Sequence, residues 1–230
     1  MKLLALDTAF EACSVALGVD GEVQECYAVA PRAHARLLLP WVSELLALAE
    51  LRLADLDAIA FTRGPGSFTS LRIGIGVVQG LAFGAGLPVA PVSSLQTAAE
   101  TARRDREQRK GGELAAALVA MDARMGEVFA GRFERRDGLM RPAGPESVLA
   151  PAAAAALVLA GDVGIGSGFA RYEALSAASD VATYLPDVWP RAGAVLDLAR
   201  DWLRTHEPLA AEQAQPVYLR DRVAEPPAPA

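Results

Sequence analysis

Histidine and cysteine side chains, the usual protein ligands of transition metals, are scarce in this chain. The two histidines, His34 and His206, lie far apart in the sequence, and the two cysteines, Cys13 and Cys26, form no Cys-x-x-Cys pair. Protein-built zinc and iron sites need several such ligands at close spacing, so we predict that the chain alone binds no metal ion. His34 stands where a helix is expected to begin, and we interpret it as a capping or surface residue.

Nucleophilic catalysis requires a nucleophile oriented by a base, and the sequence offers no such pair. A Gly-x-Ser-x-Gly segment is missing, and two histidines leave few candidate bases. Ser67, in the segment Gly64-Pro65-Gly66-Ser67, could in principle be a nucleophile. We favour the interpretation in which Ser67 or Thr69 caps the following helix. The sequence therefore predicts no catalytic residue.

Two segments lie where an ATP-binding protein would hold phosphates. Residues 63–69 connect a predicted strand to a predicted helix, where backbone N–H groups can bind an anion, but they lack the Gly-x-x-x-x-Gly-Lys-Ser/Thr pattern. Residues 7–12 contain no glycine and place Phe10 and Glu11 where backbone amides would be needed. We predict a degenerate nucleotide site, with the candidate residues Asp7, Thr8, Gly64, Gly66, Ser67 and Thr69.

The elements that would position these residues occur in the same order twice. A strand over 2–6 ends at Asp7, two strands flank the turn Asp20-Gly21, and helices then alternate with strands up to residue 103. A second strand, 114–121, ends at Asp122 and precedes the turn Asp137-Gly138. Asp7 and Asp122 could each orient a metal-bound water or simply cap a turn. This order predicts an α/β protein with the actin-like ATPase (ASKHA) fold: two similar lobes from an internal duplication, each a mixed sheet with flanking helices.

Residues 103–112, which mix charges of both signs and end in two glycines, predict a solvated connection between the lobes. A basic patch for RNA is the alternative, and the interleaved Asp105 and Glu107 oppose it. We therefore predict four segments: an N-terminal lobe (1–104) that carries the partner-interface helices, a second lobe (112–207), a C-terminal segment (208–222) and a disordered tail (223–230).

Glycines are unusually frequent in the helix predicted over 68–84. Gly76, Gly80 and Gly84 are spaced four apart and share one face, although each costs about 1 kcal/mol relative to alanine. Close approach of another helix would explain this face, and packing inside the lobe is the alternative. The preceding helix, 34–50, is apolar over more than half its circumference and contains Pro40, which could kink it. We predict a partner interface formed by Leu37, Leu38, Trp41, Leu45, Gly76, Val77, Gly80, Leu81 and Gly84.

Composition narrows the function classes further. Of the 230 residues, 52% are hydrophobic, which is enough for a folded core, and the formal net charge of −6 opposes a stand-alone nucleic-acid binder. Two cysteines are typical of a reducing compartment. No signal-peptide core follows Met1, and no run of about 18 apolar residues occurs, so we expect a cytoplasmic location and no membrane partner.

Six segments of the chain resemble the TsaB family. They run in the family's order between residues 4 and 220, and the most specific is Gly64-Pro65-Gly66-Ser67-Phe68-Thr69. The segments are 6–8, 11–16, 34–40, 64–74, 121–125 and 216–220.

This resemblance implies a non-catalytic dimerisation or scaffold subunit. Such a subunit is required to form N6-threonylcarbamoyladenosine next to the anticodon in tRNAs that read codons beginning with A. It acts with TsaD, the catalytic paralogue, and with TsaE, a small ATPase. TsaD holds its metal with a His-x-x-x-His pair on the comparable helix, whereas this chain has Leu38 four residues after His34.

The resemblance also implies how the subunit associates. It pairs with TsaD through its first two helices, forms homodimers through the same face when alone, and contacts tRNA only through the complex. ATP or ADP is expected only in that complex. The alternative is an independent actin-like-fold ATPase or kinase, or a glycopeptidase-type peptidase, which would need an intact phosphate loop or a nucleophile–base pair.

Overall fold

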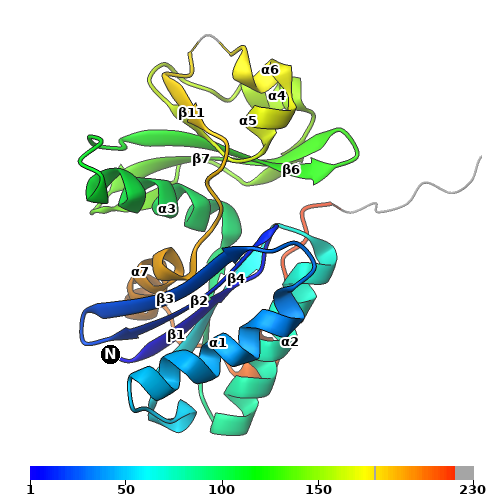
Figure 1. The fold of residues 1–230 in the computed structure, drawn as a ribbon. Helices are drawn as coiled ribbons and strands as arrows, with labels where there is room; N and C mark the ends of the chain where they lie inside the picture. Colours follow the sequence, from blue (N-terminus) through cyan, green and yellow to red (C-terminus); the bar gives the residue numbers. More distant parts are fainter. Residues whose placement is uncertain (179, 221–230) are drawn as a thin grey trace, which may run out of the picture.

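Two sheets of matching topology organise the computed structural model, which describes residues 1–178 and 180–220 (Figure 1). In the first sheet the strand order is β3-β2-β1-β4-β5, with β1 antiparallel to β2 and parallel to β4. The strands are β1 Leu3–Asp7, β2 Ala12–Val19, β3 Glu22–Val29, β4 Ala58–Gly64 and β5 Val89–Ser93.

The second sheet repeats this arrangement with later segments of the chain. Its order is β8-β7-β6-β10-β11, with β6 antiparallel to β7 and parallel to β10, and β9 pairs separately with β7. The strands are β6 Ala116–Arg124, β7 Glu127–Arg136, β8 Leu139–Pro142, β9 Ser147–Leu149, β10 Val163–Ile165 and β11 Thr183–Leu185. The repeated order confirms the predicted duplication and the actin-like fold.

Helices cover the faces of both sheets. Figure 1 shows α1 and α2 side by side on the outer face of the first sheet, and α3 and α7 between the two sheets. The α-helices are α1 His34–Leu48, α2 Phe68–Ala85, α3 Ser94–Gln108, α4 Pro151–Ala155, α5 Gly168–Arg171, α6 Glu173–Ser176 and α7 Ala192–Thr205, and the 3-10 helices are η1 Leu53–Asp55 and η2 Ala211–Gln213. Helix α1 runs continuously through Pro40, so the expected kink does not interrupt it.

The central strands of the first sheet are apolar on both faces because helices bury both faces. On the outer face, Leu4 and Leu6 of β1 share a core with Leu38 of α1 and Val78 of α2. On the inner face, Leu3 and Ala5 form a core with α7. The continuous apolar sequence of β1 follows from this double burial.

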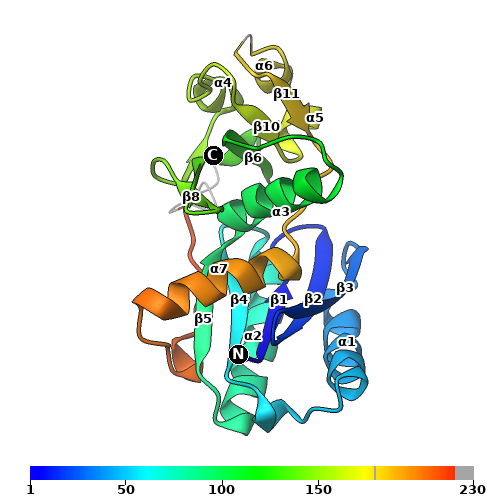
Figure 2. The same ribbon diagram turned by 90° about the vertical axis from the view of Figure 1, so that its left-hand side faces the viewer.

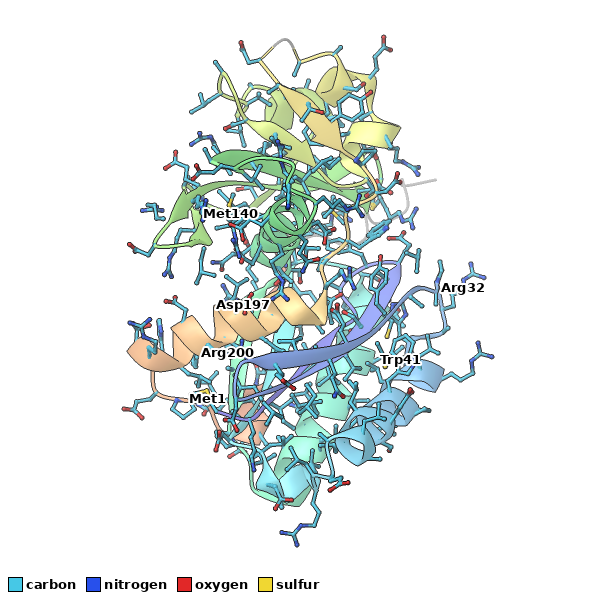
Figure 3. The ribbon with its side chains drawn as sticks, turned by 60° about the vertical axis from the view of Figure 1, so that its left-hand side comes forward. Met1, Arg32, Trp41, Met140, Asp197 and Arg200 are labelled. Atoms are coloured by element: carbon cyan, nitrogen blue, oxygen red, sulfur yellow. The ribbon has the colours of Figure 1, made fainter. Side chains whose placement is uncertain are left out.

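Helices α3 and α7 each pack against the sheet built from the other half of the chain. Helix α3 contacts β6, β7 and β8, whereas α7 contacts β1, β2, β4 and β5, which it crosses in Figure 2. Helix α3 also contacts β4 and β5, so it lies against both sheets, whereas the main contacts of α7 are with the first sheet and α3. The boundaries 1–104 and 112–207 stay a prediction. Ion pairs join the two halves here: Arg104 of α3 with Asp197 of α7, and Arg141 of β8 with Asp201 of α7. Asp197 is labelled in Figure 3.

The predicted connection 103–112 is mostly helix, because α3 continues to Gln108. Arg103 pairs within the helix, with buried Glu100 at 2.5 Å and with Glu107 at 2.7 Å. Glu100 also accepts a hydrogen bond from the Met140 amide at 2.9 Å, which ties α3 to the second sheet. The predicted disordered tail, 223–230, lies outside the described residues.

Helix α2 is, by length and composition alone, apolar enough to cross a membrane. Its buried side chains recur at helical spacing: Ile75, Val78 and Ala82 pack against the first sheet, and Leu71 joins the core that contains Phe10 and α3. We therefore interpret α2 as a helix of the fold whose opposite side is unusually apolar for a helix facing solvent.

Candidate partner interface and inter-lobe cavity

Asp7 is sealed inside the first lobe, at the end of β1. Its side chain is 1% exposed, Oδ1 accepts hydrogen bonds from the Thr62 hydroxyl at 2.7 Å and the Ala9 amide at 3.3 Å, and Oδ2 has no partner among the described residues. Burial raises the pKa of Asp7 from 3.8 to about 7, against the opposing effect of the Thr62 hydrogen bond. A sealed carboxyl that is only about half ionised near pH 7 is poorly suited to orient a metal-bound water.

The raised pKa of Asp7 predicts a pH-dependent stability. At a pH between the unfolded value near 4 and the folded value near 7, the folded chain binds a proton that the unfolded chain has released, so the free energy of unfolding decreases as pH rises. We expect a decrease of about 1 kcal/mol between about pH 6 and 7 from this group. The Asp7→Asn variant cannot ionise and should lack this component. Urea unfolding of both proteins across this range measures it, and parallel pH profiles would contradict the prediction.

The remaining candidate phosphate-loop residues are packed against the chain itself. Thr8 is buried and donates to the Ser70 carbonyl at 2.8 Å, and a Cβ on Gly66 would lie 2.3 Å from the Ala9 carbonyl oxygen. Gly64 has a φ of +107°, and a Cβ there would lie 2.7 Å from the Val217 carbonyl oxygen. The glycines therefore admit neighbouring backbone at the points where a phosphate loop would admit phosphate.

Ser67 occupies the N-cap position of α2, but its side chain caps no amide. Instead, its Oγ accepts a hydrogen bond from the Ser70 hydroxyl at 3.1 Å, and its amide donates to Ala9 O at 2.7 Å. Thr69 is exposed within the first turn. The capping interpretation thus holds for the position of Ser67 and fails for its side chain.

His34 is a buried anchor, which corrects the capping or surface interpretation. Its side chain is 2% exposed, and Nε2 lies 3.0 Å from Phe10 O and 3.1 Å from Ala12 O. Carbonyl oxygens only accept hydrogen bonds, so Nε2 carries the proton. His34 thereby joins the start of α1 to the turn between β1 and β2.

A cavity of about 720 Å³ opens between the two lobes. The β1–β2 turn, the β6–β7 turn, the start of α2 and the segment 217–220 form its walls. Arg124 reaches across it, pairing with Glu11 at 2.8 Å and with Asp122 at 3.3 Å. Arg32, Arg124 and Arg220 are not among the predicted site residues, although Arg124 and Arg220 fall in segments that carry the family resemblance.

We expect ATP and ADP to bind the isolated chain more weakly than the micromolar range. The phosphate-loop glycines contact protein backbone, and the carboxylates of Glu11 and Asp122 in the cavity wall repel a polyphosphate. Within residues 1–178 and 180–220, no group of three His, Cys, Asp or Glu side chains could hold a metal ion that would offset this repulsion. Isothermal titration calorimetry is the measurement, and a micromolar or tighter dissociation constant would refute the expectation.

The predicted interface residues divide between the surface and the core. Gly76, Gly80 and Gly84 are exposed along α2, and a Cβ on any of them would meet no atom within 4 Å. Val77 and Leu81 are half-buried beside them, as are Leu37 and Trp41 on α1.

Leu38 and Leu45 are core residues and cannot contribute directly to a partner interface. With Val42 they form a stripe at helical spacing that packs under the first sheet, and both are at most 2% exposed. Helix α1 carries two adjoining apolar stripes, and its periodicity alone cannot say which of them faces the sheet.

The most exposed apolar side chains of α1 and α2 are not among the predicted interface residues. Phe83 is 81% exposed, and Leu39 and Leu48 on α1 are also exposed. Phe83 lies beside the glycine stripe, between Gly80 and Gly84, and this position is the signal that could have identified it. Leu39 and Leu48 are nine residues apart and so project from opposite sides of α1, and Leu48 shares the side of Leu37 and Trp41. We define the α1/α2 face by Leu48, Gly76, Gly80, Phe83 and Gly84.

Comparison with known proteins gives a family for this arrangement. A family model described as "TsaD: tRNA N6-adenosine threonylcarbamoyltransferase" matches residues 26–226. Over 229 residues the chain is 41% identical to the "tRNA threonylcarbamoyladenosine biosynthesis protein TsaB" of Escherichia coli (strain K12), and the match covers 97% of this chain and 96% of that protein. The chain belongs to the TsaB family. The TsaB protein of Haemophilus influenzae is 37% identical over 97% of this chain and 95% of its own length.

Solved structures related to the TsaB family share this fold over almost the whole chain. A crystal structure from Pseudomonas aeruginosa, described as an uncharacterized protein with similarity to peptidase YEAZ, is 43% identical with a TM-score of 0.84, covering 95% of this chain and 99% of that one. YeaZ from the same organism is 42% identical with the same TM-score and coverage.

Proposed function

We propose that this protein is a non-catalytic subunit of the machinery that forms N6-threonylcarbamoyladenosine in tRNA. Its membership of the TsaB family, whose relatives are named as tRNA threonylcarbamoyladenosine biosynthesis proteins, supports the pathway. The observation that carries the scaffold role is the α1/α2 face, which combines three open glycines and exposed Phe83 on α2 with exposed Leu48 on α1. Because the substrate of that machinery is tRNA, we place the protein in the cytoplasm.

The partner that we assign to the α1/α2 face is TsaD. Glycines at positions 76, 80 and 84 remove side chains along one stripe, so a partner helix can approach closer than the usual ~8–10 Å between helix axes. Exposed apolar side chains such as Phe83 and Leu48 are a liability in water unless a partner covers them. When TsaD is missing, a second copy of the chain covers these side chains and forms a homodimer. TsaE binds to the heterodimer of this chain with TsaD.

The way in which the candidate residues are used supports the proposal that the chain alone is not catalytic. His34 Nε2 donates to two backbone carbonyls, and Leu38, the position of a second ligand in TsaD, is buried in the core. Asp7 is sealed, and backbone carbonyls of Ala9 and Val217 lie against the phosphate-loop glycines. These contacts favour a structural role for each residue.

Reconstitution tests the proposed function. Purified chain, TsaD and TsaE are incubated with unmodified tRNA and the small substrates of the reaction, and modified adenosine is quantified by mass spectrometry. We expect modification with all three proteins and none when this chain is omitted or used alone. Modification without the chain would refute the scaffold role, and hydrolysis of ATP or a peptide by the chain alone would favour the independent-enzyme alternative.

A further inference from the structure

The side chains that line the inter-lobe cavity are typical of a ligand-binding site. The proposed scaffold role does not require such a site. Its volume of about 720 Å³ lies within the range of small-molecule sites, and its walls include the apolar side chains of Phe10, Phe129, Val217 and Leu219. We propose that this cavity binds a small organic monoanion with an apolar body and a hydrogen-bond donor. The single negative charge would contact Arg32 and the first turn of α2, and the apolar body would lie against these four side chains.

The charges in the cavity wall favour one negative charge in the ligand. Three arginines line the cavity, Arg32, Arg124 and Arg220, against two carboxylates, those of Glu11 and Asp122. Arg124 is paired with both carboxylates, and Arg220 is paired with Glu127 nearby. Arg32, which extends from the segment between β3 and α1 (Figure 3), has no ion pair among the described residues. Arg171 pairs with Asp122 as well, at 3.6 Å, so in and beside the cavity four arginines face the three carboxylates of Glu11, Asp122 and Glu127. The surplus of one positive charge suits a monoanion and disfavours a polyphosphate.

The first turn of α2 supplies further donors to the same cavity. Ser67, Phe68 and Ser70 line it. The Ser67 amide donates to Ala9 O, but the amides of Phe68, Thr69 and Ser70 have no acceptor within the part of the chain that the structure describes. The first amides of an α-helix lack partners within the helix and carry its positive dipole end, so they stabilise an anion. This helix is 18 residues long.

His34 gives a second, independent indication of a ligand. Its side chain is almost completely buried and lines the cavity, and Nε2 donates to the carbonyls of Phe10 and Ala12. The other ring nitrogen, Nδ1, is then an acceptor, and it has no hydrogen-bond partner in the described residues. Because His34 lines the cavity, a donor group on a ligand bound there could pair with this free acceptor.

Calorimetry on the isolated full-length chain tests the proposal with a matched pair of probes. The acid is 6-hydroxy-2-naphthoate, a planar monoanion with a hydroxyl donor, and the neutral control is 6-hydroxy-2-naphthamide. We expect one acid molecule to bind per chain and the amide to bind about tenfold more weakly, because charge-assisted hydrogen bonds are lost. In 1H–15N spectra the acid should shift the amide signals of Phe68, Thr69 and Ser70.

Two arginine variants show whether binding occurs in the cavity. Arg32→Gln should weaken binding of the acid about tenfold and leave the amide unaffected. Arg36→Gln is the control, because Arg36 is exposed at the start of α1 and does not line the cavity. Equal affinity for acid and amide, no acid binding at about 1 mM, or shifts confined to Gly76–Gly84 would each overturn the proposal. None of these results depends on TsaD, so the scaffold role is tested separately.

Discussion

The Gly80→Arg variant is expected to remain folded, to run as a monomer and to lose its association with TsaD. A Cβ at Gly80 would meet no atom within 4 Å, so the new side chain projects from α2 without disturbing the chain's own packing. In the proposed interface it would bury an unpaired guanidinium between two closely packed helices, which costs several kcal/mol. We expect affinity for TsaD to fall at least about 100-fold, and tRNA modification to fall with it.

Analytical ultracentrifugation and calorimetry with TsaD measure this loss, and circular dichroism reports folding. Gly144→Arg is the matched control: Gly144 is also exposed, a Cβ there also meets no atom within 4 Å, and it lies in the second lobe. Arg106→Ala, near the end of α3, is a second control. Neither control should alter association. A folded Gly80→Arg variant that binds TsaD normally would place the contact elsewhere.

The Gly66→Ala variant is expected to lower the free energy of unfolding by about 3 kcal/mol or more. The new methyl group would lie 2.3 Å from Ala9 O and 3.0 Å from Ala9 C, which are backbone atoms that cannot rotate away. Relieving this clash must separate the loop from the β1–β2 turn and disturb the 2.7 Å hydrogen bond between the Ser67 amide and Ala9 O.

Gly80→Ala is the control for this substitution, because the same methyl group there meets open space on a helix. We expect it to raise the free energy of unfolding by about 0.5–1 kcal/mol through helix propensity. Urea unfolding followed by circular dichroism compares the two variants. If both variants shift the unfolding midpoint alike, Gly66 has no close-packing role and the loop remains available to a ligand.

Much of the fold could be predicted from local patterns. The apolar run that ends at Asp7 and the Asp20-Gly21 turn lie where the structure has β1 and the β2–β3 hairpin. The helix predicted over 68–84 is α2, Phe68–Ala85, because its apolar residues and Gly86 mark its face and its end. The strand, aspartate and Asp-Gly turn pattern begins again at residue 114, and this repetition predicted the second sheet. Each of these signals lies within one segment of the chain.

The candidate interface was harder to predict from local sequence patterns. The glycine stripe of α2 was recognised from its spacing, but Leu38 and Leu45 were assigned to the wrong side of α1, since a helix with two apolar stripes fits a sheet in either orientation. The packing of α7 against the first sheet also escaped prediction, because a contiguous stretch of sequence gives no indication that its last helix packs on a distant sheet.

By itself, the sequence determined the strand and helix order, the duplication and the family, because these depend on the types and spacing of residues close together in the chain. Only the tertiary structure decided what fills the space around each candidate residue. Ala9 O lies against Gly66, Val217 O lies against Gly64, and Arg32 and Arg220 meet at one cavity although 188 residues separate them. Such contacts depend on how the two sheets and the C-terminal segment pack together. The spacing of residues along the chain does not indicate which distant backbone segment will lie against a given loop.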